Sequence, residues 1–506
     1  MEINYFNLSG GINQSLTKTE LGSDTRSLFW TDSKNIEVYD NRGLVKQKGN
    51  VLLTQLPVEE KIICMCELES DDVYKLFIVT QNGKIYVYAS NSNQLTLVNK
   101  TLTGQKVSMT PFLRGVIVKT ESDSLFYIKD NENLEIEDCN LVDDNNQYIY
   151  PDGICVYKGR VWCYKNSTIY YSALGTYDNF SLEDDAGYIN DFYTDTSDIT
   201  GMKNYKDYLA IYKKERVYLL SGSNPSDFAV IPFADKGTFS NNSIVNVDNK
   251  QYFLSNGIYA LEQVGELNQI RLGSEISRNI SNEFDLINKT RISETIAINY
   301  KNKHQIWFFF PYVNDDYYHT IWINDYVNHA WFKRVVPQNL TYAVMFNSNV
   351  ITADNKGRIY REDYGSSFNG TVIDFMWKSP FLSFNKPHHR KIIDEFYFVL
   401  DDNADNKFNF SVYKDYDGNY YGDKELIFSR HYNQLLWAKE NQIDESVSYW
   451  PGDEADGLVW SIGTDTIEKA EICDSCYSVM LCVEGTEADD NCAIIGLQFR
   501  EIYNDD

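Results

Sequence analysis

The chain has 506 residues, of which 43% are hydrophobic and 15% aromatic, and this content argues against a disordered protein. Its formal net charge of −27 repels duplex DNA at long range, which excludes groove reading and phosphate clamping as expected functions. No run approaches the roughly 18 apolar residues of a membrane span, and the first residues lack the basic and apolar regions of a signal peptide. We therefore expect a protein that folds in a cytosol and does not enter a membrane.

The acidic residues are scattered along the chain rather than gathered in a tail. Two interpretations remain open: a surface that keeps the protein soluble, or an acidic channel through which DNA slides without sticking. Both use the same residues.

Residues 1–50 are expected to form an N-terminal arm with entry strands. Two short apolar runs, at 35–38 and 43–45, flank a turn that contains Asp40, Asn41 and Gly43.

Residues 51–365 contain seven hairpin-like units, in which short β-branched and aromatic runs are split by Asn-Gly or charged turns. The paired runs are 76–79 with 84–88, 115–118 with 125–128, 154–157 with 160–164, 208–212 with 216–220, 251–254 with 258–261, 305–310 with 318–323, and 350–352 with 358–360. The units follow one another every 40 to 55 residues or so, the period of four-stranded propeller blades. The sequence thus predicts an all-β chain with a β-propeller of about seven blades, or of six or eight if one unit is an insertion.

One segment within this region departs from the β pattern. Ile276, Ile280, Phe284 and Ile287 recur at three- and four-residue steps, which predicts a short inserted amphipathic helix across 274–289 with Ser274 as its N-cap. We expect it to pack on the outer face of the propeller; docking of a partner is the alternative.

Residues 366–506 are predicted to form a C-terminal β-sandwich. The apolar runs at 371–377, 392–400, 408–413, 477–483 and 493–499 lack the spacing of the blades. Asp415, Asp417 and Asn419 have the alternation of a calcium loop, but Tyr420 and Leu426 replace the Gly and Glu that an EF-hand needs, so no calcium site is expected.

The chain has nine cysteines, and four of them fall near the C-terminus: Cys473, Cys476, Cys482 and Cys492. Four thiolates can hold a tetrahedral zinc. Only the first pair has the spacing of a zinc knuckle, however, and Cys482 and Cys492 lie in strand patterns. We expect buried, reduced thiols and no metal, with these four residues as the zinc candidates if a metal is bound.

No catalytic residue or cofactor site is predicted. The Gly-x-Ser-x-Gly, His-Glu-x-x-His, Gly-Lys-Ser/Thr and Gly-x-Gly-x-x-Gly motifs are absent, and the six histidines give no pair with metal-ligand spacing. The expectation is that the protein is not an enzyme. Aromatic residues of the C-terminal region could stack on sugars, although aromatic side chains in a β domain usually belong to the core. They are Trp437, Trp450, Trp460, Tyr416, Tyr420 and Tyr421.

The order of short motifs between Ile199 and Leu261 resembles the β-propeller core of tail hub, nozzle or DNA-stabilisation proteins of short-tailed bacteriophages. Gly10 and Gly11 near the start, and the basic step at 387–391, are similar to the same family, so the resemblance extends from Gly10 to about Lys391. The residues that carry it in the core are 199–201, 216–218, 221–222, 237–238, 243–245 and 252–259.

The resemblance implies a structural component of the virion tail. Such a protein forms a homo-hexameric ring below the head-to-tail adaptor, contacts other tail proteins, and is assembled in the cytoplasm of the bacterial host. It helps to retain packaged viral DNA and then conducts it during ejection without sequence-specific binding. The alternative is a carbohydrate- or receptor-binding β-propeller protein of the virion.

Overall fold

The computed structural model describes residues 3–21, 27–40, 42–143, 145–182, 184–192, 195–264, 269–401, 406–416, 419–428 and 466–504. The chain forms two compact units. The propeller unit comprises Lys48–Val327 and Lys333–Thr371, and the sandwich unit comprises Met1–Gln47, Asn328–Phe332 and Val372–Asp506.

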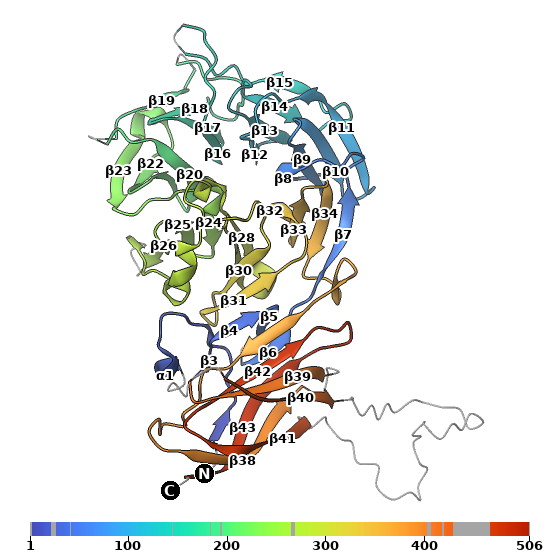
Figure 1. Cartoon of the computed structure of the whole chain (residues 1–506). Helices are drawn as coiled ribbons and strands as arrows, with labels where there is room; N and C mark the ends of the chain where they lie inside the picture. Colours follow the sequence, from blue (N-terminus) through green and yellow to red (C-terminus); the bar gives the residue numbers. More distant parts are fainter. Residues whose placement is uncertain are drawn as a thin grey trace, which may run out of the picture. The chain divides into compact units, whose positions relative to one another are not determined.

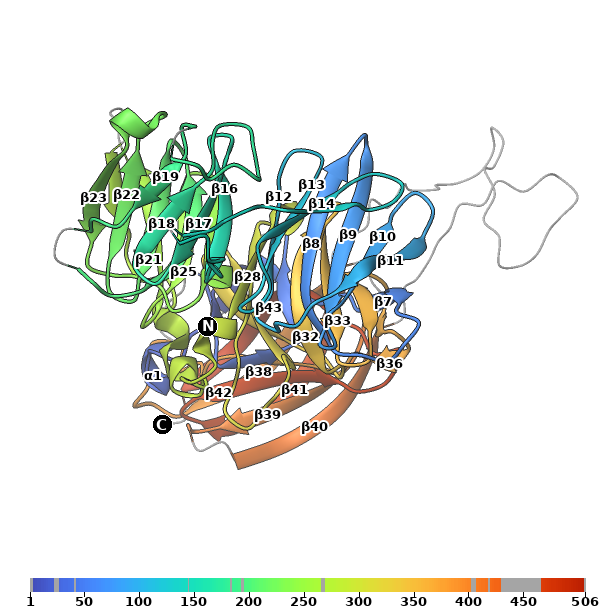
Figure 2. The ribbon, with the colours of Figure 1, turned by 90° about the horizontal axis from the view of Figure 1, so that it is seen from above.

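Seven sheets correspond to the seven predicted hairpin units. Figure 1 shows the blades following one another around a common centre, and Figure 2 shows the strands of the first blade side by side. The first three blades are β8 (Ile62–Ser70), β9 (Val73–Thr80), β10 (Lys84–Ala89) and β11 (Gln94–Thr101); β12 (Ser108–Pro111), β13 (Gly115–Lys119), β14 (Phe126–Lys129) and β15 (Ile136–Asp138); and β16 (Gly153–Tyr157), β17 (Arg160–Lys165), β18 (Thr168–Tyr171) and β19 (Gly187–Ile189).

The next three blades have the same four-stranded order. They are β20 (Ile199–Tyr205), β21 (Tyr208–Lys213), β22 (Val217–Ser221) and β23 (Ala229–Ala234); β24 (Val245–Val247), β25 (Lys250–Leu254), β26 (Ile258–Val264) and β27 (Gln269–Leu272); and β28 (Ile296–Tyr300), β29 (Gln305–Phe309), β30 (Thr320–Asp325) and β31 (Ala330–Val335). The first strand of each blade lies nearest the centre (Figure 1).

The seventh blade is closed by a strand from far away in the sequence. β32 (Leu340–Phe346), β33 (Asn349–Asp354) and β34 (Arg358–Glu362) are joined by β7 (Asn50–Gln55), which pairs antiparallel with β34. The short strands β35 (Ser367–Phe368) and β36 (Thr371–Val372) extend this sheet. The innermost strands β32 and β8 contact each other, so the last blade packs on the first.

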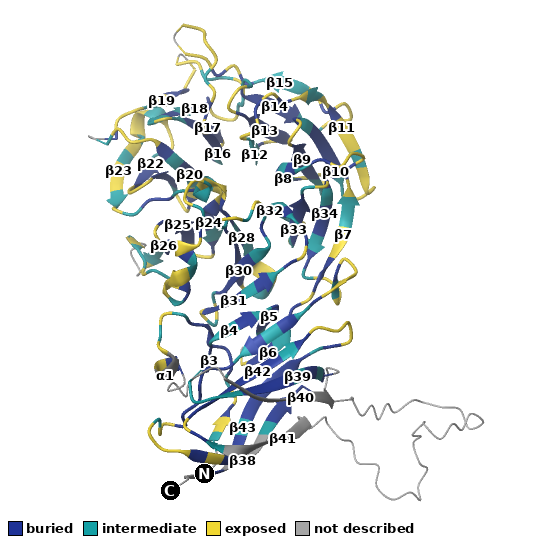
Figure 3. Cartoon of the chain, viewed as in Figure 1, coloured by how far each residue is buried: buried dark blue, intermediate teal, exposed yellow. Residues whose placement is uncertain are grey.

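The hydrophobic cores of the propeller lie between neighbouring blades. Phe77 and Val79 of the first blade share one buried cluster with Val116 and Val118 of the second, and further clusters join the following blades. The middle strands are therefore buried on both faces, whereas the outermost strands β11 and β23 are largely exposed (Figure 3). This layering explains why the middle hairpins have the strongest apolar patterns.

The sandwich unit is built from both ends of the chain. One sheet has the order β41 (Thr466–Cys476), β38 (Lys391–Leu400), β43 (Ala493–Asn504), β6 (Gly43–Lys46) and β5 (Ile36–Tyr39), with β1 (Ile3–Tyr5) also on β43. The other has the order β4 (Asp32–Lys34), β37 (Phe375–Lys378), β42 (Val479–Gly485), β39 (Asn406–Lys414) and β40 (Asn419–Phe428). Two small elements complete the N-terminal segment: the parallel pair β2 (Gly11–Ile12) with β3 (Phe29–Trp30), and the helix α1 (Lys18–Leu21).

The two sheets of this unit enclose an aromatic core. Phe398 of one sheet lies with its ring centroid 5.3 Å from that of Phe408 and 5.2 Å from that of Phe410, both on the other sheet. These contacts are the face-to-face packing of a β-sandwich. The strands of residues 1–47 thus complete the sheets of the C-terminal region.

The predicted amphipathic helix is present in a shorter and tighter form. It is the 3-10 helix η3 (Arg278–Asp285), which follows Ser277 rather than Ser274 and has a non-helical residue, Ile280, inside it. Asn and Ser favour a regular α-helix less than most residues, because their side chains can hydrogen-bond nearby backbone groups in other conformations, and Asn279, Ser281 and Asn282 fall in this segment. The apolar face is buried as expected at Ile280 and Phe284. The other 3-10 segments are η1 (Pro225–Asp227), η2 (Asn241–Ser243), η4 (Ile292–Glu294) and η5 (Lys301–Lys303).

Circular dichroism of the purified chain should be dominated by β structure, with less than about a tenth helix against the usual third. The physical reason is that the longest described helix, the 3-10 helix η3, has eight residues, whereas strands make up both units. A spectrum with an ordinary helix content would contradict the fold.

Candidate functional site

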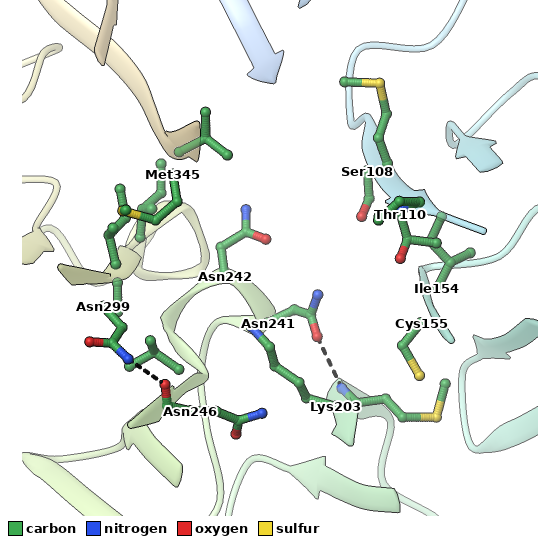
Figure 4. A pocket seen from close by; sticks show the side chains of 18 of the residues that line it. Ser108, Thr110, Ile154, Cys155, Lys203, Asn241, Asn242, Asn246, Asn299 and Met345 are labelled. Atoms are coloured by element: carbon green, nitrogen blue, oxygen red, sulfur yellow. Dashed lines mark hydrogen bonds between the residues drawn. The ribbon is translucent and has the colours of Figure 1, made fainter. Parts of the chain in front are cut away.

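A cavity of about 560 Å³ lies where the innermost strands of the propeller meet (Figure 4). Its walls come from β12, β16, β20, β24, β28 and β32, together with η2. This volume falls within the usual range for small-molecule pockets.

The wall of this central cavity is almost uncharged. No Asp, Glu or His is among the residues that line it, and Lys203 is its one cation. The Lys203 ammonium donates to the Ile244 carbonyl at 2.7 Å. Burial lowers the pKa of Lys203, partly offset by the nearby Cys155. A half-buried lysine that already donates to a carbonyl is poorly suited to clamp a phosphate.

Asparagine side chains in the cavity wall link one blade to the next. Asn246 Nδ2 donates to the Asn204 carbonyl at 3.0 Å, and Asn299 Nδ2 donates to the Asn246 carbonyl at 2.9 Å. Asn241 Oδ1 accepts from the Met202 amide at 3.0 Å. These three asparagines are therefore used to join β20, β24 and β28. The buried Asn299 Oδ1 has no partner among the described residues.

A second cavity, of about 820 Å³, lies on the propeller away from the innermost strands. Its walls come from the loop after β15, from β18 and β19, and from the loop between these two strands. Unlike the central cavity, it combines exposed aromatic side chains with carboxylates and amides.

The structure distributes the C-terminal cysteines over different sheets. Cys476 ends β41 and pairs with Lys391, whereas Cys482 lies on β42 between Lys378 and Ser411. Cys492 precedes β43, and Cys473 belongs to β41, although its side chain lies outside the described residues. Among the side chains that the structure does describe, no group of three His, Cys, Asp or Glu could hold a metal ion.

The sugar-stacking hypothesis for the C-terminal aromatics falls mostly on residues that are not described. Trp437, Trp450 and Trp460 lie outside the described ranges, as do the side chains of Tyr420 and Tyr421. The Tyr416 ring packs against Phe381, with centroids 5.3 Å apart.

Neither cavity could be predicted as a site from the sequence. The central one is made by the first strand of each blade, so its residues are scattered over 238 positions between Ser108 and Met345. The second depends on polar loops without a motif. The one sequence feature that could have indicated this second cavity is the high content of Tyr, Asn and Asp between residues 140 and 190.

Comparisons with known proteins identify no family for this chain. No protein-family model matches the chain, and no curated protein matches it. Among solved structures, the computationally designed Ika8 protein is similar over 62% of this chain and 100% of its own, with 11% identity and a TM-score of 0.38. A chain from the Mitotic Checkpoint Complex is similar over 62% of this chain and 93% of its own, with 9% identity and a TM-score of 0.38. Such similarities carry no argument about function.

One further feature concerns membranes. In the part of the chain that the structure describes, no helix is long and apolar enough to cross a bilayer.

Metal analysis of the purified chain should find no stoichiometric zinc, and Cys473→Ser should leave the metal content unchanged. Burial raises the pKa of Cys482 and of Cys492 to about 12, so both thiols stay protonated, whereas zinc binds thiolates. One zinc per chain that is lost on Cys473→Ser would overturn this expectation.

Proposed function

We propose that the chain is a structural component of the tail of a short-tailed bacteriophage, a hub or nozzle ring below the head-to-tail adaptor. In this role it retains packaged DNA and forms part of the ejection channel. The observation that carries the proposal is the resemblance between Ile199 and Leu261, a stretch that forms the fourth and fifth blades. The residues that carry it have structural roles there.

The Gly-Thr step of the motif joins these two blades. Gly237 lies against the backbone of Lys213. The buried Thr238 hydroxyl bonds the Leu254 carbonyl at 2.8 Å and the Ser243 hydroxyl at 3.1 Å. Its amide donates to the Lys213 carbonyl at 3.0 Å. The motif thus fixes the connection from the fourth blade to the fifth.

The same segment also reaches the sixth blade. The buried Ser240 hydroxyl is 2.9 Å from the Ser293 carbonyl and 2.7 Å from the Thr295 carbonyl, directly before β28. Because the residues of this sequence pattern connect the blades, the pattern favours a rigid structural protein over an enzyme.

The basic step at 387–391 has a structural role as well. The Lys391 ammonium is buried and donates to the carbonyls of Lys386, His389 and Tyr477, each at 2.7 Å. These hydrogen bonds of Lys391 hold the loop before β38 in place within the sandwich unit. This lysine therefore does not offer its charge to DNA.

The charge of the chain suits a passage for DNA. Each phosphate that a protein neutralises adds counterion-release affinity, which would slow ejection. Six chains would carry −162 formal charges, six times −27 each. We expect the lumen of the ring to be acidic or neutral. The central cavity of one propeller has the size of a small-molecule pocket, so the proposed DNA path is the lumen between subunits.

The proposed ring contacts use loops, the N-terminal segment and the sandwich unit. A closed propeller offers few free strand edges for pairing with a second chain. The partners in this proposal are further copies of the chain, the adaptor and other tail proteins, with viral DNA passing through. The virion tail is the proposed location, after assembly in the cytoplasm of the host.

Native mass spectrometry of the purified chain tests the oligomeric part of this proposal. The expected species is a hexamer of about 352 kDa, built from chains of 58.7 kDa. A stable monomer that binds glycans would favour the alternative, a carbohydrate- or receptor-binding propeller of the virion. The observation that supports this alternative is the second cavity, the one of about 820 Å³.

A further inference from the structure

The cavity of about 820 Å³ on the second and third blades has the composition of a binding site. Figure 1 shows β18 and β19 at the outer side of the third blade, where they form one wall. The loop after β15 and the loop before β19 form the others. Its volume lies in the upper part of the range for small-molecule pockets, which leaves room for a short chain of sugar rings.

Several polar side chains that line this cavity are open to solvent and can exchange their hydrogen bonds to water for bonds to a ligand. They are the carboxylate of Asp178, the side-chain amides of Asn140 and Asn190, and the hydroxyl of Thr168. An amide both donates and accepts, a hydroxyl does the same, and a carboxylate accepts at two oxygens. This set matches the hydroxyl groups of a saccharide, which also donate and accept.

Aromatic and aliphatic side chains supply an apolar surface beside these groups. Tyr188 on β19 is 48% exposed, and its ring centroid lies 6.3 Å from that of Tyr170 on β18. Leu182 is 62% exposed, and Phe180 lies in the same loop. An exposed tyrosine face with polar groups around it is the surface on which the C–H face of a sugar ring stacks.

The carboxylates that line the cavity repel anionic ligands. Most of these carboxylates already accept hydrogen bonds, so they attract a cationic ligand only weakly. Among the described residues that line the cavity are Asp143, Asp178 and Asp184, and none of these lining residues is Lys or Arg. Asp143 already accepts from the amides of Asn145 and Gln147, each at 2.8 Å. Asp184 accepts from the Asn179 amide group at 3.2 Å. Among the described residues of the cavity, Asp178 is the carboxylate for which the structure shows no hydrogen bond.

The loops of the cavity are held in place by their own hydrogen bonds. The Ile149 amide donates to the Leu141 carbonyl at 3.0 Å, and Val142 forms an antiparallel bridge with Tyr148. In the other loop, the Ala173 amide donates to the Asn179 carbonyl at 2.8 Å. Hydrogen bonds of this kind reduce the conformational entropy that the described parts of the walls lose when a ligand enters.

We propose that this cavity binds an uncharged saccharide. The ring of Tyr188 stacks on the sugar, and Asp178, Asn140 and Asn190 hydrogen-bond its hydroxyl groups. This site does not depend on the proposed ring, since all its walls belong to one chain.

The test uses the full-length chain on a glycan array that carries neutral and sialylated oligosaccharides, followed by calorimetric titration of the best neutral glycan. We expect neutral glycans to bind and sialylated versions of the same glycans not to bind. Tyr188→Ala and Asp178→Ala should each weaken the affinity about tenfold or more, as for other central contacts. Matched controls are Tyr364→Ala, an exposed tyrosine outside the cavity, and Asp207→Ala, an exposed aspartate outside it. Both should bind like the unmodified protein.

Three results would overturn the proposal. One is a chain that binds no glycan on the array. Another is glycan binding that the Tyr188 and Asp178 variants retain while their circular dichroism is unchanged. The third is preferential binding of a Lys-rich peptide at the Asp178 side chain, which would identify a cation site instead. None of these results bears on the hexameric ring, so the two proposals fail separately.

Discussion

Glu362→Ala should destabilise the propeller unit by about 3–5 kcal/mol, the usual cost of leaving a buried charge without its partner. Glu362 accepts from Arg334 Nη2 at 2.6 Å and from Arg334 Nε at 3.1 Å. Its other oxygen accepts from Asn50 at 3.0 Å and from Thr352 at 2.7 Å. Since Glu362 is 2% and Arg334 1% exposed, water cannot replace the lost carboxylate.

The effect should be large because this ion pair fastens the closing strand of the seventh blade. Arg334 also donates to the carbonyls of Lys48 at 2.6 Å and Gly49 at 2.8 Å, directly before β7. Urea unfolding followed by fluorescence measures the change in free energy. Arg114→Ala is the control, because it breaks the exposed pair of Arg114 with Asp71 and should hardly change stability. Equal effects of the two substitutions would show that the buried pair does not hold the blade.

Gly237→Ala should prevent the fourth and fifth blades from packing as they do. A Cβ atom at Gly237 would lie 1.7 Å from the Lys213 carbonyl oxygen, far inside contact distance. The backbone cannot move away without losing the bond from the Thr238 amide to that same carbonyl. We expect the free energy of unfolding to fall by more than about 4 kcal/mol, a size that only severe steric or core defects usually reach.

The matched control for this steric effect is Gly273→Ala. There the nearest atom to a new Cβ is the Ala260 carbonyl oxygen at 3.3 Å, which a small shift relieves. Thermal unfolding of both variants, with expression level as a second readout, makes the comparison. A Gly237→Ala protein as stable as the Gly273→Ala protein would contradict the packing described for this joint.

The hairpins of the blades could be predicted because their signals are local. Asn82 and Gly83 stand between the two runs of one hairpin, and Gly83 has the positive φ of 78° that the turn requires. β29 is buried along its whole length, so it forms a continuous apolar run that can be recognised in the sequence. Seven such units were enough to indicate a propeller.

The closing strand could not be predicted in the same way. β7 pairs with β34 about 300 positions away, Asn50 facing Glu362, and nothing in the local sequence of either strand specifies the other. The strands of residues 1–47 that complete the sandwich depend on equally distant partners, such as Leu44 beside Ile494. Long-range pairing is set by the whole fold rather than by periodicity.

The outermost strands and the candidate sites were missed for a related reason. β11 is mostly exposed, and its short alternation at Leu95 and Leu97 ends in the polar run 99–101. The cavities gather residues from several blades or loops, so they become visible only when the blades are assembled. The 3-10 form of η3 shows the limit of periodicity: the spacing of Ile280 and Phe284 predicted the buried face but not the helix type.

The most direct test of the central claim is a cryo-electron microscopy map of the assembled tail at a resolution that places side chains. The account predicts six copies of this chain in a ring below the head-to-tail adaptor, around a lumen that is acidic or neutral. A lumen lined by a belt of Lys and Arg, or a chain that stays monomeric within otherwise complete virions, would contradict it.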